Sequence, residues 1–387
     1  MKPDNRLDAD VAVVGLGSMG SLALWQLARR GVKAIGFEQF EPGHDRGSGH
    51  GESRIIRSCY AEGPEYVPLV QAAFPPWRRL EEETATELLT ENGALFLGRL
   101  DSGFVQGAQA TADHHGLQYD ILDPDTVQRR YPPHRLEPGE IGFLDLKAGF
   151  LRPELAVRTA VARAVQLGAE VVAPARVQAI QERGDAVEVR TDSRTYRAGQ
   201  AIAAVGAWVG KLLPGLGLPT WVERQVMVWY PARRPEEFTP DRFPIFIRDR
   251  GAPDLTWYGF PSLDGATVKV AIHHDGQEAD PDSLDRDVHA ADYEAVTTLV
   301  RRAIPGLEPV LVRGKVCMYT NTPDGDFIIG RPPGTSRLVM LGPMAGHGFK
   351  FAAVVGAIGA DLATEGSTGL PIDAFSPARF ETAGQPG

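Results

Sequence analysis

Apolar residues recur along the N-terminal part of the chain with two different periods. An apolar run at 10–15 is typical of a strand, and residues 18–30 show the spacing of a helix that ends before Gly31. A second strand-like run follows at 32–38. A strand, a helix and a strand in this order predict the first βαβ unit of a doubly wound sheet.

The middle of the chain alternates between helical and strand-like patterns. We expect a helix over 66–91 that is broken at Pro75–Pro76, because proline removes a helical hydrogen bond, and another helix over 153–167. Short apolar runs separated by turns over 221–275 predict an antiparallel sheet. A further helix is expected to start near Asp285.

The α/β pattern returns near the C-terminus, where residues 336–366 predict a strand, a glycine loop and a final helix. We therefore predict an α/β fold in which a split, Rossmann-like nucleotide-binding domain accompanies a second domain built on an antiparallel β-sheet. The expected nucleotide-binding domain is discontinuous and comprises residues 1–62, 150–220 and 310–387. The substrate domain would comprise residues 63–149 and 221–309.

Composition excludes some classes of protein. With 40 Lys+Arg against 50 Asp+Glu, the net charge is −10, which disfavours nucleic-acid binding. No apolar run approaches the roughly 20 residues of a membrane span, and the polar N-terminus does not resemble a signal peptide. With only two cysteines, a disulfide framework is not expected, and we predict a cytoplasmic protein.

The glycine-rich segment after the first strand is the clearest nucleotide-binding signal. In GLGSMG, Gly15 permits a tight turn, Gly17 lets a pyrophosphate approach the backbone, and Gly20 lets the helix pack against the strand. Glu38 ends the second strand and is placed to accept hydrogen bonds from ribose hydroxyls. The motif predicts a dinucleotide site, but it does not separate FAD from NAD.

Other candidates for chemistry lie near the C-terminus, where GKVCMYTNTPDGDFIIG (314–330) is followed by GHGFKF (346–351). A lone cysteine is most often a small buried hydrophobe, and we assign that role to Cys59. Cys317 taken alone would receive the same interpretation. The sequence shows no cluster of metal ligands and no Ser/His/Asp arrangement.

Several segments, in order along nearly the whole chain, resemble the monomeric sarcosine oxidase and N-methyl-L-tryptophan oxidase family of covalent FAD amine oxidases. The matching segments are GESRIIR (51–57), EGPEYVPL (62–69), WYGFP (257–261), VKVAIHHDGQEADPD (268–282), CMYTNTPDGDFIIG and GHGFKF. The resemblance implies FAD bonded through its 8α-methyl group to Cys317. A thiolate reacts in such chemistry, so nearby positive charge would help.

The resemblance also implies a set of residues around the flavin. The cofactor-binding residues expected from it, together with the glycine motif and its flanks, are Gly15, Gly17, Ser18, Met19, Gly20, Glu38, Gln39, Ser48, His50, Arg54, Ile55, Val177, Gly206, Trp208, Cys317, Gly346, His347, Gly348 and Lys350. For His50, Arg54 and His347, packing in the core is the alternative interpretation.

Cations are implied in two catalytic roles. Arg57 and Lys350 resemble the family's pair that holds the substrate carboxylate, and arginine can do so through two parallel bonds. A surface salt bridge is the alternative for Arg57. Lys269 matches the family's oxygen-activating lysine, where a fixed cation stabilises superoxide as it forms. Taken alone, Lys269 reads as an outward-facing strand residue.

His273 matches a family histidine in the substrate pocket, and Tyr258 and Tyr319 match active-site or flavin-contact positions, with core packing again the alternative. Two segments depart from the family. Pro343, Met344 and Ala345 replace a Gly-hydrophobic-Ser run, and 246–256 is slightly longer than the matching turn, with Arg248 and Asp249 where the family is often apolar. Sarcosine itself is therefore not assured as the substrate.

The expected reaction is oxidation of the C–N bond of a secondary-amine amino acid, which yields an amine, formaldehyde and H₂O₂. The alternatives are a cyclic imino acid or biosynthetic intermediate as the substrate, or a dehydrogenase with an acceptor other than O₂. Lys269 favours the oxidase. We expect a monomer without a metal and with no partner beyond the amine substrate and O₂.

Overall fold

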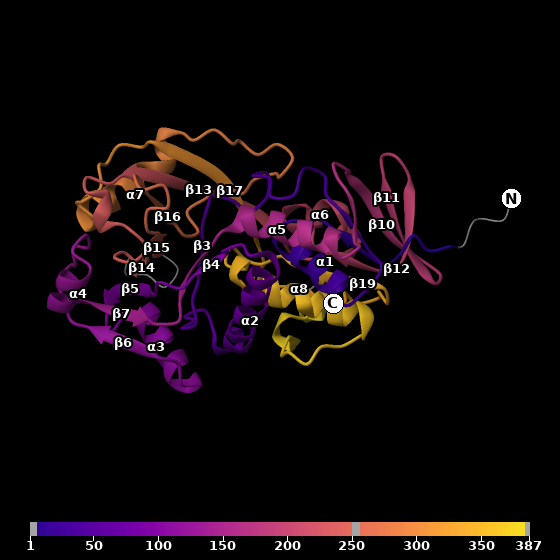
Figure 1. Cartoon of the computed structure of the whole chain (residues 1–387), viewed down its shortest axis with the longest axis horizontal. Coiled ribbons are helices and arrows are strands. Elements are labelled where there is room, and N and C mark those ends of the chain that lie inside the picture. Colours follow the sequence, from indigo (N-terminus) through magenta and orange to yellow (C-terminus); the bar gives the residue numbers. More distant parts are fainter. Residues whose placement is uncertain (1–5, 250–255, 384–387) are drawn as a thin grey trace.

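The computed structural model describes residues 6–249 and 256–383. The chain forms an elongated molecule with two lobes, each built around its own sheet (Figure 1). The first and last parts of the chain meet in one lobe, which holds α1, α8 and β19, while β5–β7, β14–β16 and α7 lie in the other (Figure 1). This arrangement confirms the predicted combination of an α/β part and a largely antiparallel part.

The first sheet contains the predicted βαβ unit. Strand β1 (Ala9–Val14) pairs in parallel with β2 (Ala34–Phe37), and helix α1 (Ser18–Arg29) connects the two. β1 also pairs in parallel with β12 (Thr195–Ala203), which pairs with β19 (Leu338–Leu341). Strands from the start, middle and end of the chain therefore meet in one sheet, as the split nucleotide-binding domain requires.

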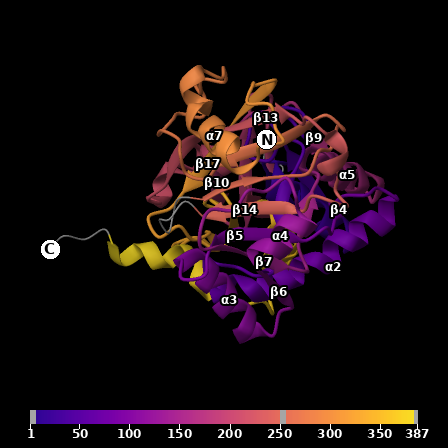
Figure 2. The same ribbon diagram turned by 90° about the vertical axis from the view of Figure 1, so that its left-hand side faces the viewer.

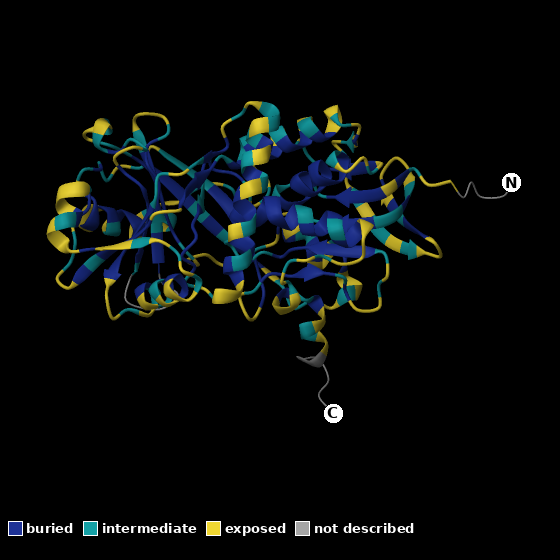
Figure 3. Ribbon diagram, turned by 60° about the horizontal axis from the view of Figure 1, so that its bottom comes forward, coloured by how far each residue is buried: buried dark blue, intermediate teal, exposed yellow. Residues whose placement is uncertain are grey.

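Helices cover one face of this sheet. Helix α1 packs against α5 (Pro153–Gln166) and α8 (Ala352–Thr364), and their apolar side chains form the largest buried cluster of the molecule. β10 (Val177–Arg183) and β11 (Ala186–Thr191) pair antiparallel and continue the sheet through the pairing of β11 with β12, and their apolar side chains pack with those of β1 and β2. The buried positions concentrate in the middle of both lobes (Figure 3).

The second sheet has the strand order β17-β13-β16-β15-β14-β5-β7-β6 and is antiparallel except between β14 and β5. Its strands are β5 (Ala94–Arg99), β6 (Tyr119–Leu122), β7 (Glu140–Asp145), β13 (Trp221–Pro231), β14 (Ile245–Asp249), β15 (Thr256–Gly259), β16 (Thr267–Ile272) and β17 (Arg313–Asn321). Figure 2 shows this lobe from its far end, with β14, β5, β7 and β6 side by side. β17 carries Cys317 and belongs to this sheet, although it lies in the segment 310–387. The domain boundaries remain a proposal.

Two short strands extend the first sheet: β9 (Glu170–Val172) pairs with β2, and β18 (Ile329–Gly330) pairs with β19. A small third sheet joins β3 (Arg54–Ile56), β8 (Gly149–Leu151) and β4 (Leu89–Thr90). Further helices are α3 (Gly103–His115), α4 (Pro124–Arg130) and α6 (Val209–Leu212). In the part of the chain that the structure describes, no helix is long and apolar enough to span a membrane, and no group of His, Cys, Asp and Glu side chains is arranged to hold a metal.

Two predicted helices differ from the structure. Helix α2 (Val67–Thr84) runs through Pro75–Pro76 without a break, so the predicted interruption is wrong. Its buried face, with Phe74 and Trp77, packs against α8, and this packing outweighs the two lost hydrogen bonds. Helix α7 (Ala290–Ala303) begins five residues after Asp285, because its N-terminus is capped by His289 together with Asp292.

Candidate flavin and substrate site

One cavity of about 740 Å³ runs between the two lobes. Its walls come from the glycine turn before α1, the loop 43–49, strand β17 and the loop 341–350. All the site residues predicted from the sequence line this cavity except Gly20, His50 and Lys269. The structure therefore brings together residues that lie up to 335 positions apart, from Gly15 to Lys350.

The three glycines of the first turn differ in what surrounds them. Gly15 has φ +87°, and a Cβ on it would lie 2.5 Å from the carbonyl oxygen of Ala204. A Cβ on Gly20 would lie 1.8 Å from the carbonyl oxygen of Gly15, so Gly20 allows the close packing of helix on strand. A Cβ on Gly17 would meet no atom within 4 Å. The backbone at Gly17 therefore faces open space.

This open space suits a pyrophosphate. Gly17 is the N-cap of α1, and no side chain caps the first turn of the helix. The first N–H groups of α1 are then available to an anion, which the helix dipole also favours. Thr320 Oγ1 in the same cavity is buried and has no hydrogen-bond partner among the described residues. The residues present fit the diphosphate and ribityl parts of FAD.

The nucleoside end of the site is defined by Glu38. Its carboxylate is buried and accepts hydrogen bonds from Leu16 N at 2.9 Å and Phe40 N at 3.0 Å. These bonds hold the carboxylate at the end of β2, where its remaining lone pairs can accept ribose hydroxyls. Val177, Gly206 and Trp208 line the same region with Gln39.

The loop that follows residue 47 is held by opposite charges. The Glu154 carboxylate accepts hydrogen bonds from the N–H groups of Gly51 and Glu52. Lys269 Nζ donates to the carbonyl oxygens of Gly51 at 2.7 Å and Ser53 at 2.6 Å. The loop is thus fixed between an anion and a cation.

Lys269 and His50 are buried next to this loop. Lys269 Nζ lies 4.0 Å from the ring centroid of Phe260, which lines the cavity. Burial, followed by repulsion from Arg54, lowers the pKa of Lys269 well below its usual value, and Glu154 and Glu52 oppose this shift. Both ring nitrogens of His50 lack a partner among the described residues, and burial lowers its pKa to about 3, so the ring is neutral.

Cys317 lies in β17 and lines the cavity while being almost fully buried. Burial raises the pKa of its thiol, and the nearby cations Arg54, Lys269 and Arg286 act in the opposite direction. Arg54 donates to the carbonyl oxygen of Ser48 at 2.8 Å, so it stays beside the cavity. The three cations therefore offset part of the effect of burial, which still raises the pKa of the thiol.

Arg57 directs its charge into the cavity from the end of β3. Its guanidinium is buried. Nη2 donates to both carboxylate oxygens of Glu62, and Nη1 donates to the carbonyl oxygen of Cys59 at 3.0 Å. Burial raises the pKa of Glu62, but attraction to Arg57, His347 and Lys350 and the hydrogen bond from Arg57 together lower it to about 2. Glu62 is therefore an anion at neutral pH. This partner of Arg57 is not among the residues expected from the sequence.

Lys350 lies in the 3₁₀ turn Phe349–Phe351, directly before α8. Its Nζ donates to the carbonyl oxygen of His347 at 2.7 Å and to the hydroxyl of Tyr60 at 3.4 Å. Burial, and then repulsion from Arg57, lowers the pKa of Lys350 to about 7, while Glu62 raises it. The charge of Lys350 thus changes near neutral pH.

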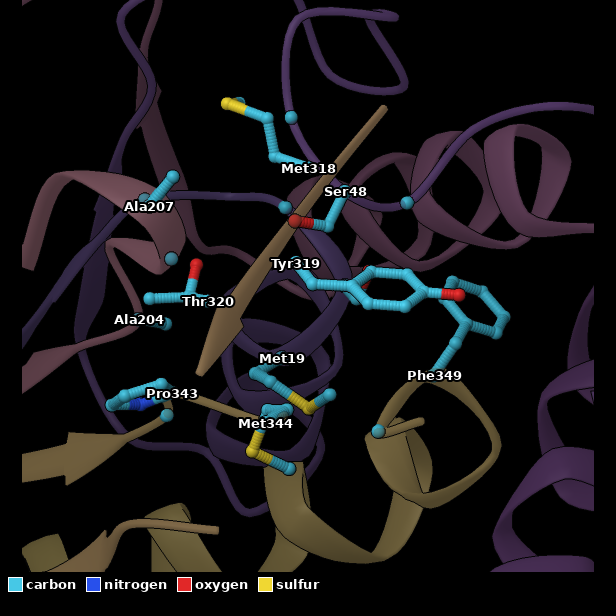
Figure 4. Close-up of a pocket in the computed structure, with 18 of the residues that line it drawn as sticks. Met19, Ser48, Ala204, Ala207, Met318, Tyr319, Thr320, Pro343, Met344 and Phe349 are labelled. Carbon is cyan, nitrogen blue, oxygen red and sulfur yellow. The ribbon is translucent and has the colours of Figure 1, made fainter. Parts of the chain in front are cut away.

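Aromatic side chains complete the wall near these cations. Tyr319 Oη lies 3.1 Å from His273 Nδ1, and Tyr258 lines the cavity beside them. Burial, followed by repulsion from His274, lowers the pKa of His273 well below its usual value, so its ring is neutral. Figure 4 shows Tyr319 on its strand with Met344 and Phe349 around the same space.

The two departures from the family have different outcomes. Pro343 and Met344 line the cavity, as expected for a loop that borders the substrate. Arg248, by contrast, is buried in β14, ion-paired with Glu140, and does not line this cavity. The rest of the expected lid-like turn, 250–255, lies outside the described residues.

Comparison with known proteins agrees with this geometry. The family model described as FAD dependent oxidoreductase matches residues 10–362. The chain is 39% identical to monomeric sarcosine oxidase of Streptomyces avermitilis, over 97% of this chain and 98% of that protein. It is 34% identical to N-methyl-L-tryptophan oxidase of Yersinia pestis, over 97% of this chain and all of that protein.

Solved structures share the architecture. NikD in its open form, described as an unusual amino acid oxidase essential for nikkomycin biosynthesis, is 27% identical, with a TM-score of 0.85 over 96% of this chain and 98% of that chain. L-Proline dehydrogenase from P. horikoshii has a TM-score of 0.83 at 21% identity, over 97% of this chain and 99% of that chain, and shares the fold.

The fold, the glycine turn and the matching family model define the class: the chain belongs to the FAD dependent oxidoreductases. Within that family, its resemblance to sarcosine oxidases and N-methyl-L-tryptophan oxidases is confirmed at 34–39% identity over nearly the whole chain. The protein is therefore an enzyme, an FAD-dependent oxidoreductase, and its cofactor is FAD.

Proposed function

We propose that this enzyme oxidises secondary-amine amino acids, such as sarcosine or N-methyl-L-tryptophan, with O₂ as the acceptor. The observation that carries the proposal is the pair of buried cations, Arg57 and Lys350, in the wall of the FAD cavity. An amino-acid carboxylate in a partly desolvated site needs such charges. FAD, when bound, supplies the two-electron acceptor. The cytoplasmic location and the monomeric state expected from the sequence are part of this proposal.

The substrate carboxylate would compete with Glu62 for Arg57. Glu62 holds the guanidinium in place before substrate arrives, and Lys350 has donors left for a second anion. Because Arg57 is already paired, the net gain on binding is smaller than that of a free arginine. Neutral His273 and Tyr319 would line the space around the amine. They add no positive charge there, and the site would bind the amine in its unprotonated form.

The overall reaction would consume one N-methyl amino acid, one O₂ and one H₂O, and release the amine, formaldehyde and H₂O₂. Lys269 would stabilise the superoxide that forms as O₂ takes up electrons, since the Gly51 and Ser53 carbonyl oxygens fix its Nζ and favour the ammonium form against the effect of burial. If aerobic incubation with either substrate yields formaldehyde and H₂O₂ in equal amounts, the proposal holds. Amine oxidation without H₂O₂ would instead indicate a dehydrogenase.

Cys317 is the proposed point of covalent attachment. For the link to form, its S–H bond and one C–H bond of the 8α-methyl group of FAD would break and a bond between Sγ and that carbon would form; the two hydrogens would leave as protons and, with the two electrons released, would reduce O₂ to H₂O₂. Arg54, Lys269 and Arg286 support this proposal because they oppose the effect of burial on the thiol pKa. Cys59 offers a control, because it is buried away from the cavity and burial, followed by repulsion from Asp145, raises its thiol pKa.

We expect Cys317→Ser to release all of its FAD on acid precipitation, whereas the unchanged protein and Cys59→Ser retain it. The reason is that the reacting species is a thiolate, and the hydroxyl of serine has a far higher pKa than a thiol, so it does not supply a comparable nucleophile. The measurement is flavin absorbance in the pellet, with the mass of the intact chain as a second readout. If the flavin stays attached to Cys317→Ser, the covalent link is formed by another residue.

A second candidate substrate follows from the loop 343–345. Met344 lines the cavity where the family carries a different side chain, and Ala345 adopts φ +41°. A changed loop shape would suit a cyclic imino acid or a biosynthetic intermediate. This candidate gains support if neither N-methyl amino acid is oxidised although the flavin is bound.

A further inference from the structure

Both cations proposed for carboxylate binding touch one aromatic ring, that of Tyr60. The guanidinium carbon of Arg57 lies 4.3 Å and Lys350 Nζ lies 5.2 Å from the ring centroid. The ring is fully buried. The ring centroids of Tyr66 and Phe351 lie 5.0 Å and 5.5 Å from the centroid of the Tyr60 ring. Tyr60 does not itself line the cavity.

The hydroxyl of Tyr60 lies between Lys350 and His347. Tyr60 Oη is 2.6 Å from His347 Nδ1, and Lys350 Nζ is 3.4 Å from Tyr60 Oη. On the other side of the imidazole, His347 Nε2 lies 3.4 Å from the carbonyl oxygen of Gly325. These contacts join residues 60, 325, 347 and 350 in one chain of hydrogen bonds.

The direction of each bond follows from the donors available. Burial lowers the pKa of His347 to about 3, so the imidazole is neutral and carries one N–H. The Gly325 oxygen can only accept, which places that N–H on Nε2 and leaves Nδ1 as an acceptor. Tyr60 must then donate its proton to Nδ1, and its oxygen lone pairs are free to accept from Lys350.

We propose that Tyr60 is a positioning residue that sets the charge and the direction of Lys350 for the substrate carboxylate. The inference rests on the carboxylate site of the proposed function. Lys350 has two acceptors among the described residues, the His347 carbonyl and the Tyr60 hydroxyl, and both favour the ammonium form. The hydroxyl stays turned toward Lys350 because His347 binds its proton.

Other charged and titratable groups face Lys350, and they do not replace this contact. Arg57 opposes the ammonium form and Glu62 favours it. Glu62 is engaged with Arg57, whose Nη2 donates to both of its oxygens, while neutral His347 and His273 carry no charge. A single conservative substitution, Tyr60→Phe, therefore removes a side-chain acceptor from Lys350 and leaves these charged groups in place.

Tyr60→Phe removes the hydroxyl and keeps the ring under both cations. Tyr66→Phe is the matched control, because Tyr66 is equally buried in the same aromatic cluster but donates its hydroxyl to Asp326 instead. The probe is acetate, which carries the carboxylate but cannot be oxidised. Its dissociation constant is read from the change in flavin absorbance of the holoenzyme between about pH 6 and about pH 9.

In the unchanged protein and in Tyr66→Phe, acetate affinity should fall as the pH rises through the pKa of Lys350, about 7. In Tyr60→Phe, the fall should begin about half a pH unit lower, and acetate should bind roughly three- to tenfold more weakly at about pH 8. With an amine substrate, KM should rise while the rate of flavin reduction at saturation changes little. A purely structural role would not produce this pH shift.

The outcomes separate this inference from the proposed function. If acetate does not perturb the flavin of the unchanged protein, the carboxylate site itself is wrong. If acetate binds, but Tyr60→Phe gives the same pH profile as Tyr66→Phe, the role of Tyr60 is overturned. A double-mutant cycle with Lys350→Met provides a second test: Tyr60→Phe should have no further effect once Lys350 is removed, and additive effects would refute the coupling.

Discussion

Lys269→Met is expected to slow the reoxidation of the reduced flavin by roughly 100- to 1,000-fold, the loss typical of removing one preorganised charge from an active site. Lys269 is buried, and its ammonium is held by the Gly51 and Ser53 carbonyl oxygens, so its position does not depend on substrate. Methionine keeps the length and apolar stem of lysine without its charge. The rate of flavin reduction by substrate should change much less, because the carboxylate is held elsewhere.

The measurement is stopped-flow absorbance after mixing the anaerobically reduced enzyme with O₂. Lys147→Met is a suitable control, because Lys147 is exposed and its Nζ also lies near an aromatic ring, 4.8 Å from the centroid of Phe74, but outside the cavity. In Lys269→Met the loop 51–53 loses the two hydrogen bonds that the lysine donates to it, so the flavin content of the variant should be checked first. Equal rates of flavin reoxidation in Lys269→Met and Lys147→Met would show that Lys269 does not take part in the reaction with O₂.

Arg57→Ala and Lys350→Ala are each expected to raise the KM of an amino-acid substrate with little change in flavin content. A hydrogen bond to a charged group is worth about 1.5–3 kcal/mol, which corresponds to roughly 10- to 150-fold in affinity. The effect of Arg57→Ala should be the larger of the two, because it also leaves Glu62 as an unpaired anion in the cavity. That carboxylate would repel the carboxylate of the substrate.

Two further variants separate these contributions. Arg57→Ala combined with Glu62→Gln should recover part of the lost affinity, since the repulsion is gone while the arginine is still missing. Arg99→Ala provides the control, because Arg99 pairs with Asp101 at an exposed position away from the cavity. Steady-state kinetics at several pH values gives the readout. An unchanged KM in both Arg57→Ala and Lys350→Ala would exclude these cations as the carboxylate site.

The glycine turn and the strand–helix pattern could be predicted because local backbone demands fix them. Gly15 and Gly20 each stand where a Cβ would collide with backbone, and the sequence spacing alone reveals such positions. The continuity of helix α2 could not be predicted, because its two prolines argue locally for a break while packing against the distant α8 stabilises the uninterrupted helix. The capping of α7 by His289 was missed because histidine is not a usual N-cap residue.

The site itself was only partly predictable from the sequence. Motif matches located Arg57 and Lys350, but nothing in the spacing indicated that Glu62 would occupy Arg57 or that Tyr60 would join Lys350 to His347. Those contacts depend on side-chain positions across as many as 290 residues of chain.

The central claim is that secondary-amine amino acids reduce the flavin in this cavity. The most direct measurement is the anaerobic absorbance of the purified holoenzyme after addition of sarcosine and, separately, of N-methyl-L-tryptophan. Bleaching of the flavin by either compound, followed by recovery of the spectrum and formation of H₂O₂ when air is admitted, is the result predicted here. A flavin that both compounds leave oxidised would contradict the claim and direct the search to cyclic imino acids.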